Sequence, residues 1–331
     1  MALETRLTRR LGLAAPIISA PMAFAAGGRL AAAVSAAGGL GLIGGGYGDE
    51  VWLRQQFDKV PRRTVGCGFI TWSLRKQPHL LDLTLEYEPR AICLSFGNPE
   101  PFASRIKSTR ALLICQVQTR RDAEQAIECH ADIIVAQGAE AGGHGEARAT
   151  ITLVPEIADL IAAKAPETLL CAAGGIADGR GLAAALMLGA DGVLVGSRLW
   201  ASTEAEVGPR MHAAALSSNG DDTIRSRLMD LARRLEWPER YTARVLKNRF
   251  IERWQGREEE LLSVAETEAV KYREAWAKDD PEGSNTFVGE AVGMIDKILP
   301  VSEIISDMVD EAVACLAAGA HMAQDTASIE P

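Results

Sequence analysis

Short apolar runs alternate with stretches of helical spacing along residues 14–200 of this 331-residue chain. Each run ends in glycine or another small residue, and an alanine-rich or charged stretch follows it, which is the pattern of a strand and then a helix. Eight runs are predicted to be strands: 16–20, 39–43, 64–70, 91–96, 112–117, 132–137, 169–173 and 192–196. Helices are predicted at 29–37, 50–57, 73–85, 99–106, 119–129, 153–163 and 181–188.

This alternation predicts an α/β fold. Continuous apolar strands separated by helices are typical of a parallel sheet that is covered on both faces. Eight such units are the number that closes a (β/α)8 TIM barrel, and we favour that fold. An open, doubly wound sheet is the alternative, because it needs no fixed number of strands. A weak internal repeat favours the barrel, since residues 125–137 and 183–196 both read as a helix, Ala-Asp and a strand.

The composition changes after residue 202. Residues 203–284 are charged and have helical spacing, and they show too few strand-like runs for a second α/β domain. We interpret them as a helical extension or lid. Residues 287–318 are again rich in alanine and valine at helical spacing. The predicted barrel domain therefore comprises residues 1–202 and part of 285–331.

Charge and cysteine content narrow the class of function. Lys and Arg number 35 and Asp and Glu 44, so the net charge is −9 and no nucleic-acid partner is expected. With 47% hydrophobic and 24% charged residues, the chain reads as globular rather than disordered or coiled coil. The six cysteines form no C-x-x-C pair and most lie in apolar runs. We expect buried side chains rather than a metal or redox site, as in a reducing cytoplasm.

Two interpretations compete for residues 6–26. Arg6, Arg9 and Arg10 precede an apolar stretch, and residues 23–25 resemble a cleavage site, as in a signal peptide. Pro16 and Pro21 interrupt that stretch, which also supplies the first predicted strand. We favour the strand and expect a cytoplasmic protein. No window of about 18 uninterrupted apolar residues predicts a membrane helix.

Candidate chemistry follows the sixth predicted strand, because active sites of parallel barrels lie at the carboxyl ends of the strands. Residues 137–145 read Gln-Gly-Ala-Glu-Ala-Gly-Gly-His-Gly. Glycines let backbone N–H groups approach a ligand closely. His144 is the only histidine at such a strand end, and we favour a catalytic role over a structural one. Glu140 is either a general base or a carboxylate bonded to loop amides.

Two glycine-rich loops follow the seventh and eighth strands. They contain Gly174-Gly175 and Gly196-Ser197. Consecutive loops of this kind match the phosphate site common in TIM barrels, although two ordinary tight turns are the alternative. Asp178 is expected to cap the next helix rather than touch an anion. Ser197 lacks a G-x-S-x-G context and is expected to donate to phosphate rather than act as a nucleophile. No metal-ligand spacing is present, and we expect no metal.

At these motifs the sequence resembles the nitronate monooxygenase family, formerly called 2-nitropropane dioxygenases. The resemblance covers most of the chain and rests on PIISAPM (16–22), AAGGLG (36–41), VAQGAEAGGHG (135–145) and AAGGIADGRGLAAALMLGADGVLVGS (172–197). It implies a TIM barrel that binds FMN non-covalently and oxidises alkyl nitronates with O₂ to a carbonyl compound and nitrite. His144 matches the family's catalytic histidine. The resemblance implies FMN contacts at Ala20, Pro21, Met22, Gly68, Gln137, Gly142, Gly143, Ala173, Gly174, Gly175, Val195, Gly196 and Ser197.

Other FMN barrels share these motifs. Enoyl-acyl-carrier-protein reductases of the FMN type often carry Glu where this chain has Gln137, which favours the nitronate enzymes. NAD(P)H:quinone reductases and a non-catalytic flavin-binding protein remain as alternatives. Many family members carry Asn where this chain has Gly68, and a residue between the histidine and the next glycine. The expected partners are a small-molecule substrate and O₂, with no membrane and with a homo-oligomer left open.

Overall fold

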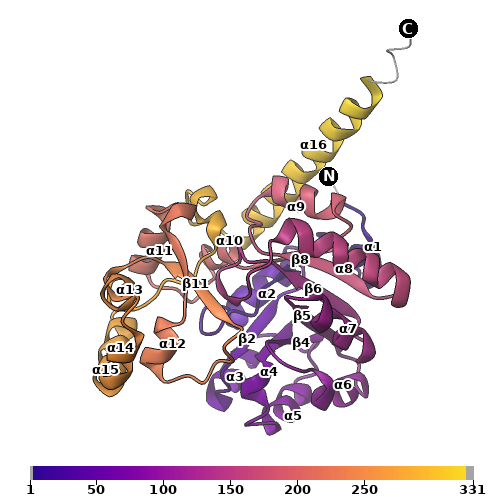
Figure 1. The fold of residues 1–331 in the computed structure, drawn as a ribbon. Coiled ribbons are helices and arrows are strands. Elements are labelled where there is room, and N and C mark those ends of the chain that lie inside the picture. Colours follow the sequence, from indigo (N-terminus) through magenta and orange to yellow (C-terminus); the bar gives the residue numbers. More distant parts are fainter. Residues whose placement is uncertain (1–2, 326–331) are drawn as a thin grey trace.

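The computed structural model describes residues 3–325. Its main sheet holds eight parallel strands in the order β1-β9-β8-β6-β5-β4-β3-β2 (Figure 1). Their bounds are β1 Ile17–Ser19, β2 Leu42–Gly46, β3 Gly66–Ile70, β4 Ala91–Ser95, β5 Leu112–Val117, β6 Ile133–Gln137, β8 Leu169–Ala173 and β9 Gly192–Val195. All eight predicted strands are present, although β2 begins at Leu42, three residues later than the predicted run 39–43, and the α/β TIM-barrel class is confirmed.

A short bridge closes the sheet between β1 and β2. Ile18 pairs in parallel with Leu40, just before β2 begins. The Ser19 N–H donates to the Leu40 carbonyl at 3.0 Å, and the Ser19 hydroxyl accepts from the Leu42 N–H at 2.8 Å. Because the first and second strands are linked in this way, the strands form a nearly closed barrel rather than an open, doubly wound sheet.

Helices surround the barrel on its outer face, with one exception (Figure 1). Their bounds are α1 Arg6–Leu11, α2 Gly28–Ala36, α3 Glu50–Phe57, α4 Thr71–Leu74, α5 His79–Glu86, α6 Glu100–Lys107, α7 Arg120–Glu128, α8 Thr150–Lys164, α9 Gly179–Met187 and α10 Ser197–Trp200. The exception is α1, whose Leu7 and Leu11 pack with the side chains inside the barrel. The helix predicted over 73–85 is divided into α4 and α5, because Pro78 lacks an N–H and stands directly before α5. Asp178 caps α9 as predicted, accepting from the Gly181 N–H at 3.0 Å.

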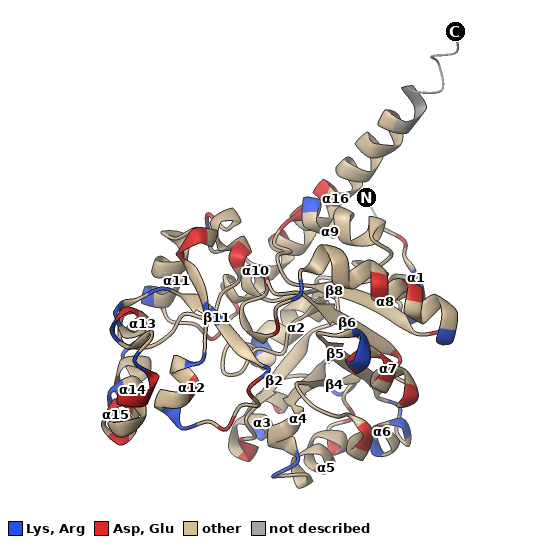
Figure 2. Ribbon diagram, viewed as in Figure 1, with Lys and Arg blue, Asp and Glu red and all other residues tan. Residues whose placement is uncertain are grey.

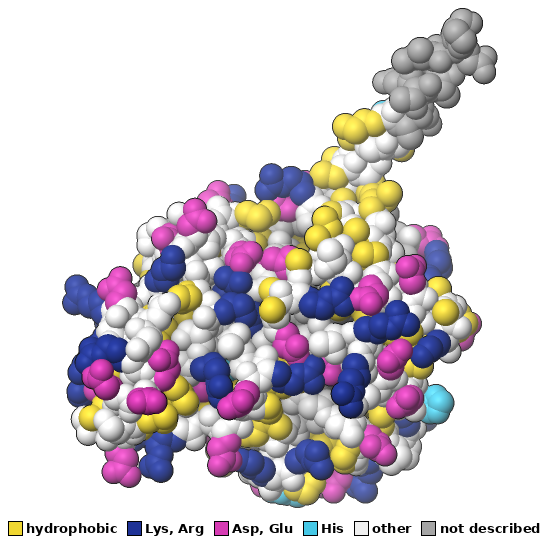
Figure 3. Space-filling view, in the orientation of Figure 1, with side chains coloured by type: hydrophobic (Ala, Val, Ile, Leu, Met, Phe, Trp, Pro, Cys, Tyr) yellow, Lys and Arg dark blue, Asp and Glu magenta, His cyan; other side chains and the backbone are white. Residues whose placement is uncertain are grey.

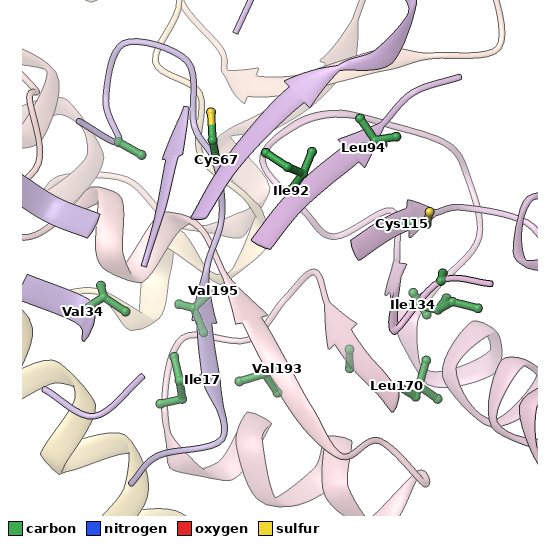
Figure 4. Close-up of a cluster of buried hydrophobic side chains, with 14 of the residues drawn as sticks. Ile17, Val34, Cys67, Ile92, Leu94, Cys115, Ile134, Leu170, Val193 and Val195 are labelled. Atoms are coloured by element: carbon green, nitrogen blue, oxygen red, sulfur yellow. The ribbon is translucent and has the colours of Figure 1, made fainter. Parts of the chain in front are cut away.

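Apolar side chains form two layers, one inside the barrel and one between the strands and the helices. On β4, Ala91 and Cys93 belong to the inner layer, whereas Ile92 and Leu94 belong to the outer one. Figure 4 shows the outer layer, with contributions from most of the strands. Four cysteines are buried in these layers as predicted: Cys67, Cys93, Cys115 and Cys171. Burial raises the pKa of the Cys93 thiol to about 12, so that it behaves as an apolar group.

Residues 203–284, which we call the cap, contain more than the predicted helices. The helices are α11 Pro209–Leu216, η1 Gly220–Asp222, α12 Leu228–Arg233, α13 Arg249–Trp254, α14 Glu258–Ser263 and α15 Ala265–Ala277. The strands β10 Thr223–Ser226 and β11 Thr242–Leu246 were not predicted. They pair antiparallel with each other, and β11 pairs with β7 Gly143–Gly145 of a barrel loop. The cap is therefore joined to the barrel by backbone hydrogen bonds.

The chain returns to the barrel after the cap. It passes through η2 Glu290–Met294 into α16 Val301–Asp325, which packs on α9 and α2. Val301, Ile304 and Met308 are buried at the start of α16, whereas Met322 is 74% exposed, and this end of the helix projects from the body (Figures 1 and 3). Acidic and basic residues are interspersed over the outer elements (Figure 2). Among residues 3–325, every helix is too short or too polar to cross a bilayer.

Candidate active site

A cavity of about 700 Å³ lies between the carboxyl ends of the barrel strands and the cap. The predicted site residues that line it are Ala20, Pro21, Met22, Gly68, Gln137, Gly142, Gly143, His144, Ala173, Gly174, Gly175, Gly196 and Ser197. Val195 does not line the cavity, because its side chain is buried in the outer apolar layer. Its carbonyl accepts from the Ala20 N–H at 2.9 Å and so fixes that residue of the lining.

Gly68 fits this chain's own packing. A Cβ placed at residue 68 would lie 2.3 Å from Cγ of Pro21, well inside van der Waals contact. An asparagine here, as in many members of the family that the sequence resembles, requires Pro21 to move. The pyrrolidine ring of Pro21 therefore occupies the space that an asparagine side chain at residue 68 would need.

His144 is held by the cap. It lies on β7, where it is the register partner of Ala243 of β11, and its side chain is 8% exposed. Nε2 lies 2.9 Å from Oδ2 of Asp230 on α12. The Trp237 indole stacks on the imidazole, with ring centroids 3.5 Å apart and planes 6° apart. The ring is thus fixed by a carboxylate at one edge and by an indole on one face.

Asp230 was missed in the sequence. It lies 86 residues beyond His144, in a segment interpreted as a helical extension or lid. The available signal was a single acid within the apolar run Leu228–Ala232. In the structure Asp230 is 2% exposed, and its Oδ1 has no hydrogen-bond partner among the described residues. A buried carboxylate whose single partner is an imidazole points to chemistry rather than to stability alone.

The pKa of His144 is lowered by its surroundings. Burial lowers its pKa below the ordinary 6.5, and the hydrogen bond and charge of Asp230 offset part of that effect. The imidazole is therefore mostly neutral near pH 7. Since the carboxylate of Asp230 accepts, we assign the hydrogen to Nε2, which leaves the lone pair on Nδ1.

Gln137 fixes the backbone of the same loop. Its amide nitrogen donates to the His144 carbonyl at 3.1 Å. Its amide oxygen accepts from Gln116 at 3.0 Å and from Gln118 at 2.7 Å. With these three bonds the orientation of the amide is determined, and Gln137 positions the residue that carries the base.

Glu140 is structural. Its carboxylate accepts from the Thr150 N–H at 3.0 Å and from the Thr150 hydroxyl at 2.8 Å, at the start of α8. These bonds satisfy the first turn of the helix, so Glu140 acts as a cap supplied from a neighbouring loop. Of the two roles considered for Glu140, the structure favours the structural one.

Two arginines clamp the glycine-rich loop to the cap. Arg225 of β10 and Arg244 of β11 are register partners, and both donate to the Ala139 carbonyl at 3.1 Å. Burial and the charge of Arg244 lower the pKa of Arg225 to about 10, which leaves it charged at neutral pH. The loop that carries His144 is therefore held by side chains as well as by the β7–β11 ladder.

The remaining glycines form a cradle that leaves space for a ligand. Gly174 and Gly175 have φ of +102° and +74°, a conformation that favours glycine. A Cβ at Gly196 would meet nothing closer than 3.6 Å. The Ser197 hydroxyl accepts from the Gly289 N–H at 2.8 Å and keeps its hydrogen free to donate. These groups are suited to an oxyanion or cofactor phosphate, and residues 3–325 contain no cluster of three or more side chains suited to a metal.

Comparisons with known proteins cover most of the chain. The family model described as nitronate monooxygenase matches residues 4–69 and 70–311. The nitronate monooxygenase of Neurospora crassa is 31% identical over 89% of this chain and 88% of its own. Nitronate monooxygenase npaC of Metarhizium robertsii is 34% identical over 91% of each chain. Among solved structures, FabK from Thermotoga maritima is 31% identical with a TM-score of 0.83, covering 97% of this chain and 99% of its own.

Proposed function

The chain belongs to the nitronate monooxygenase family and is an oxidoreductase, and we propose that it oxidises alkyl nitronates with O₂ to a carbonyl compound and nitrite, using non-covalently bound FMN. One observation supports this most directly. A neutral imidazole, His144, paired with a buried carboxylate, shares one cavity with a glycine cradle suited to a phosphate.

The residues present fit FMN. The cavity of about 700 Å³ lies within the range of roughly 300–1,000 Å³ usual for cofactor sites. Gly174, Gly175, Gly196 and Ser197 would hold the phosphate through backbone N–H groups and a hydroxyl, at the loops where TIM barrels commonly bind one. Residues 20–22 and Gln137 would contact the ring and the ribityl chain. The G-x-G-x-x-G spacing at Gly39, Gly41 and Gly44 runs into strand β2 and does not form the strand-to-helix turn of a dinucleotide fingerprint. With one such cradle among residues 3–325, we expect FMN rather than FAD to be released on denaturation.

His144, Asp230 and Trp237 would have separate roles in the reaction. When bound, FMN would accept electrons from the nitronate and pass them to O₂. Nδ1 of His144 would remove the proton from the carbon beside the nitro group of a neutral nitroalkane. Asp230 stabilises the imidazolium that forms, and Trp237 keeps the ring in plane. A preformed nitronate has already lost this proton and does not need the base.

The alternative is an NAD(P)H-dependent FMN reductase of the enoyl or quinone type. The similarity to FabK of Thermotoga maritima over nearly the whole of both chains favours keeping it. Gln137, where enoyl reductases often carry Glu, argues for the nitronate activity. A flavin-binding protein without activity is the weakest candidate, because it leaves the buried His144–Asp230 pair without a role. The cysteine usage supports a reducing cytoplasm as the place of action.

Anaerobic mixing tests the choice. The purified holoprotein is mixed separately with an alkyl nitronate, NADH, NADPH and a crotonyl thioester, and flavin absorbance is followed. Bleaching by the nitronate alone is the expected result. Bleaching only by a nicotinamide would move the assignment to a reductase, and a flavin that no compound bleaches would leave the non-catalytic interpretation.

Asp230→Asn is expected to lower nitroalkane turnover by roughly ten- to a hundredfold, because an amide neither fixes the tautomer nor stabilises the imidazolium. Asp230 raises the pKa of His144, so its neutralisation should move the acid limb of kcat/KM to lower pH. The pH profile with a neutral nitroalkane checks both effects. The other charges that act on His144, Arg225 and Arg233, are unchanged in this variant. A lower rate with an unmoved acid limb would show that Asp230 is merely structural.

A further inference from the structure

The cap places a guanidinium in the wall of the cavity beside His144. Arg233 ends α12, three residues after Asp230, and it lines the cavity. Helical residues three apart share a face, so α12 directs Asp230 to the base and Arg233 to the space in front of it. Arg233 was absent from the sequence prediction, because nothing local distinguishes it from its exposed neighbour Arg234.

The guanidinium of Arg233 makes few hydrogen bonds with other side chains of the protein. Nη2 donates to the Tyr47 hydroxyl at 2.7 Å, and the Tyr272 hydroxyl also interacts with the guanidinium. No ion pair within 4.0 Å joins Arg233 to a carboxylate of residues 3–325. A guanidinium carries five N–H donors. None of the nitrogens of Arg233 is among the buried atoms without a partner, so each of them either has a partner or is accessible, and the side chain lines the cavity.

Aromatic rings hold the cation without neutralising it. The guanidinium carbon lies 5.3 Å from the ring centroid of Tyr47, 5.9 Å from that of Tyr272 and 6.0 Å from that of Phe287. Cation–π contacts of this kind stabilise a desolvated arginine and leave its edge free. In such apolar surroundings a charge-assisted hydrogen bond to a ligand is stronger than in water.

The free donors and the base belong to one connected wall. The Tyr47 hydroxyl that accepts from Arg233 also accepts from Nε1 of Trp237 at 3.1 Å, and Trp237 stacks on His144. Nearby, the Asn285 N–H donates to the Tyr272 hydroxyl at 3.3 Å, while its buried side-chain amide has no partner among the described residues. The wall thus retains polar groups that the described protein atoms do not satisfy.

We propose that Arg233 is the anion receptor of the substrate and binds the two oxygens of its nitro or nitronate group. The inference rests on the proposed function. A planar guanidinium matches a planar two-oxygen anion in a bidentate manner. As the C–H bond breaks, the proton passes to Nδ1 of His144 and the electron pair moves onto the nitro oxygens, where Arg233 stabilises the new charge.

Anion binding to the holoprotein tests this without turnover. Sodium nitrite and sodium nitrate are titrated anaerobically into the oxidised holoprotein, with calorimetry and flavin difference absorbance as readouts. Arg233→Gln is expected to weaken both anions by roughly tenfold to a hundredfold, the scale of a lost charge-assisted hydrogen bond. Arg234→Gln removes the same charge from the adjacent exposed position, where Arg234 pairs with Glu266, and is expected to bind both anions as the unmodified protein does.

Arg233→Lys keeps the charge without the fork and is expected to lose roughly tenfold. If Arg233→Gln loses its flavin or its near-ultraviolet circular dichroism, the anion affinity of Arg233→Lys tests the proposal instead. Wild-type anion affinity in a folded Arg233→Gln or Arg233→Lys variant would overturn the proposal.

A second comparison distinguishes binding of the nitronate group from binding of a carboxylate elsewhere on the substrate. KM is measured for an alkyl nitronate that carries no other charge and for one with a terminal carboxylate. A higher KM for both in Arg233→Gln supports binding of the nitronate. A higher KM for the carboxylated compound alone would show that Arg233 recognises a carboxylate, and would overturn the proposal as stated.

The inference and the proposed function fail separately. If nitrite and nitrate binding depends on Arg233 but no nitronate is oxidised, the anion receptor stands and the proposed reaction does not. If nitronates are oxidised and Arg233→Gln changes neither anion affinity nor KM, the reaction stands and the receptor does not.

Discussion

Replacing His144 by alanine is expected to lower turnover of neutral nitroalkanes by roughly a hundredfold or more, the scale of a lost general base. The reason is the single lone pair at Nδ1, which the Nε2–Asp230 bond leaves available. Preformed nitronates should lose much less, because their proton is already gone. Steady-state rates with the same compound supplied as nitroalkane and as nitronate measure the difference.

The backbone should tolerate this change. β7 pairs with β11 through main-chain atoms, with Gly143, His144 and Gly145 opposite Arg244, Ala243 and Thr242, and alanine keeps these bonds. Flavin content and circular dichroism therefore serve as controls. Wild-type rates with both forms of the substrate would show that His144 is structural.

The second large effect is expected at the cradle. Gly196→Ala should weaken FMN binding by roughly tenfold to a hundredfold, because a methyl group would stand between the backbone and the phosphate. Residue 196 has φ of −104° and ψ of −85°, at the margin of the α region, so alanine adds some backbone strain, but the new Cβ would meet no protein atom closer than 3.6 Å. The apoprotein should fold normally. Gly175→Ala should weaken FMN similarly, but its φ of +74° adds backbone strain.

Flavin titration of the apoproteins, with circular dichroism alongside, measures this effect. His144→Ala is the matched control, since it changes the same cavity without touching the cradle, and it should keep nearly normal affinity. If both glycine variants bound FMN as tightly as the unmodified protein, the phosphate would have to lie elsewhere, and the site assigned from the barrel loops would fall.

The barrel was predictable because its signals are local. A run such as 169–173 is apolar throughout, as a strand covered on both faces must be, and Gly174 follows its end. Strands β10 and β11 gave no such signal. Thr223–Ser226 and Thr242–Leu246 are short and carry Arg225 and Arg244 on one face, so their pattern resembles an exposed helix. Their pairing depends on Gly143–Gly145, far away in the sequence.

The same distinction explains the site. Gly174, Gly175 and His144 lie in contiguous motifs whose residue types suggest a ligand. Asp230 lies beside His144 and Arg233 lines the cavity only because the fold directs α12 toward the barrel, and no periodicity reveals that direction. Trp237 looked like one more apolar residue among charges. The half of the cavity supplied by the barrel was therefore predictable, and the half supplied by the cap was not.

The pairing of β7 with β11 has a consequence for thermal inactivation of the enzyme. The cap's own apolar core, around Met229, Val245 and Ile251, is much smaller than the outer apolar layer of the barrel. Local opening of the smaller core would break the β-ladder and release His144 from both Asp230 and Trp237. Heat inactivation would then begin as a loss of proton abstraction in molecules whose barrel, and the flavin in it, are still intact.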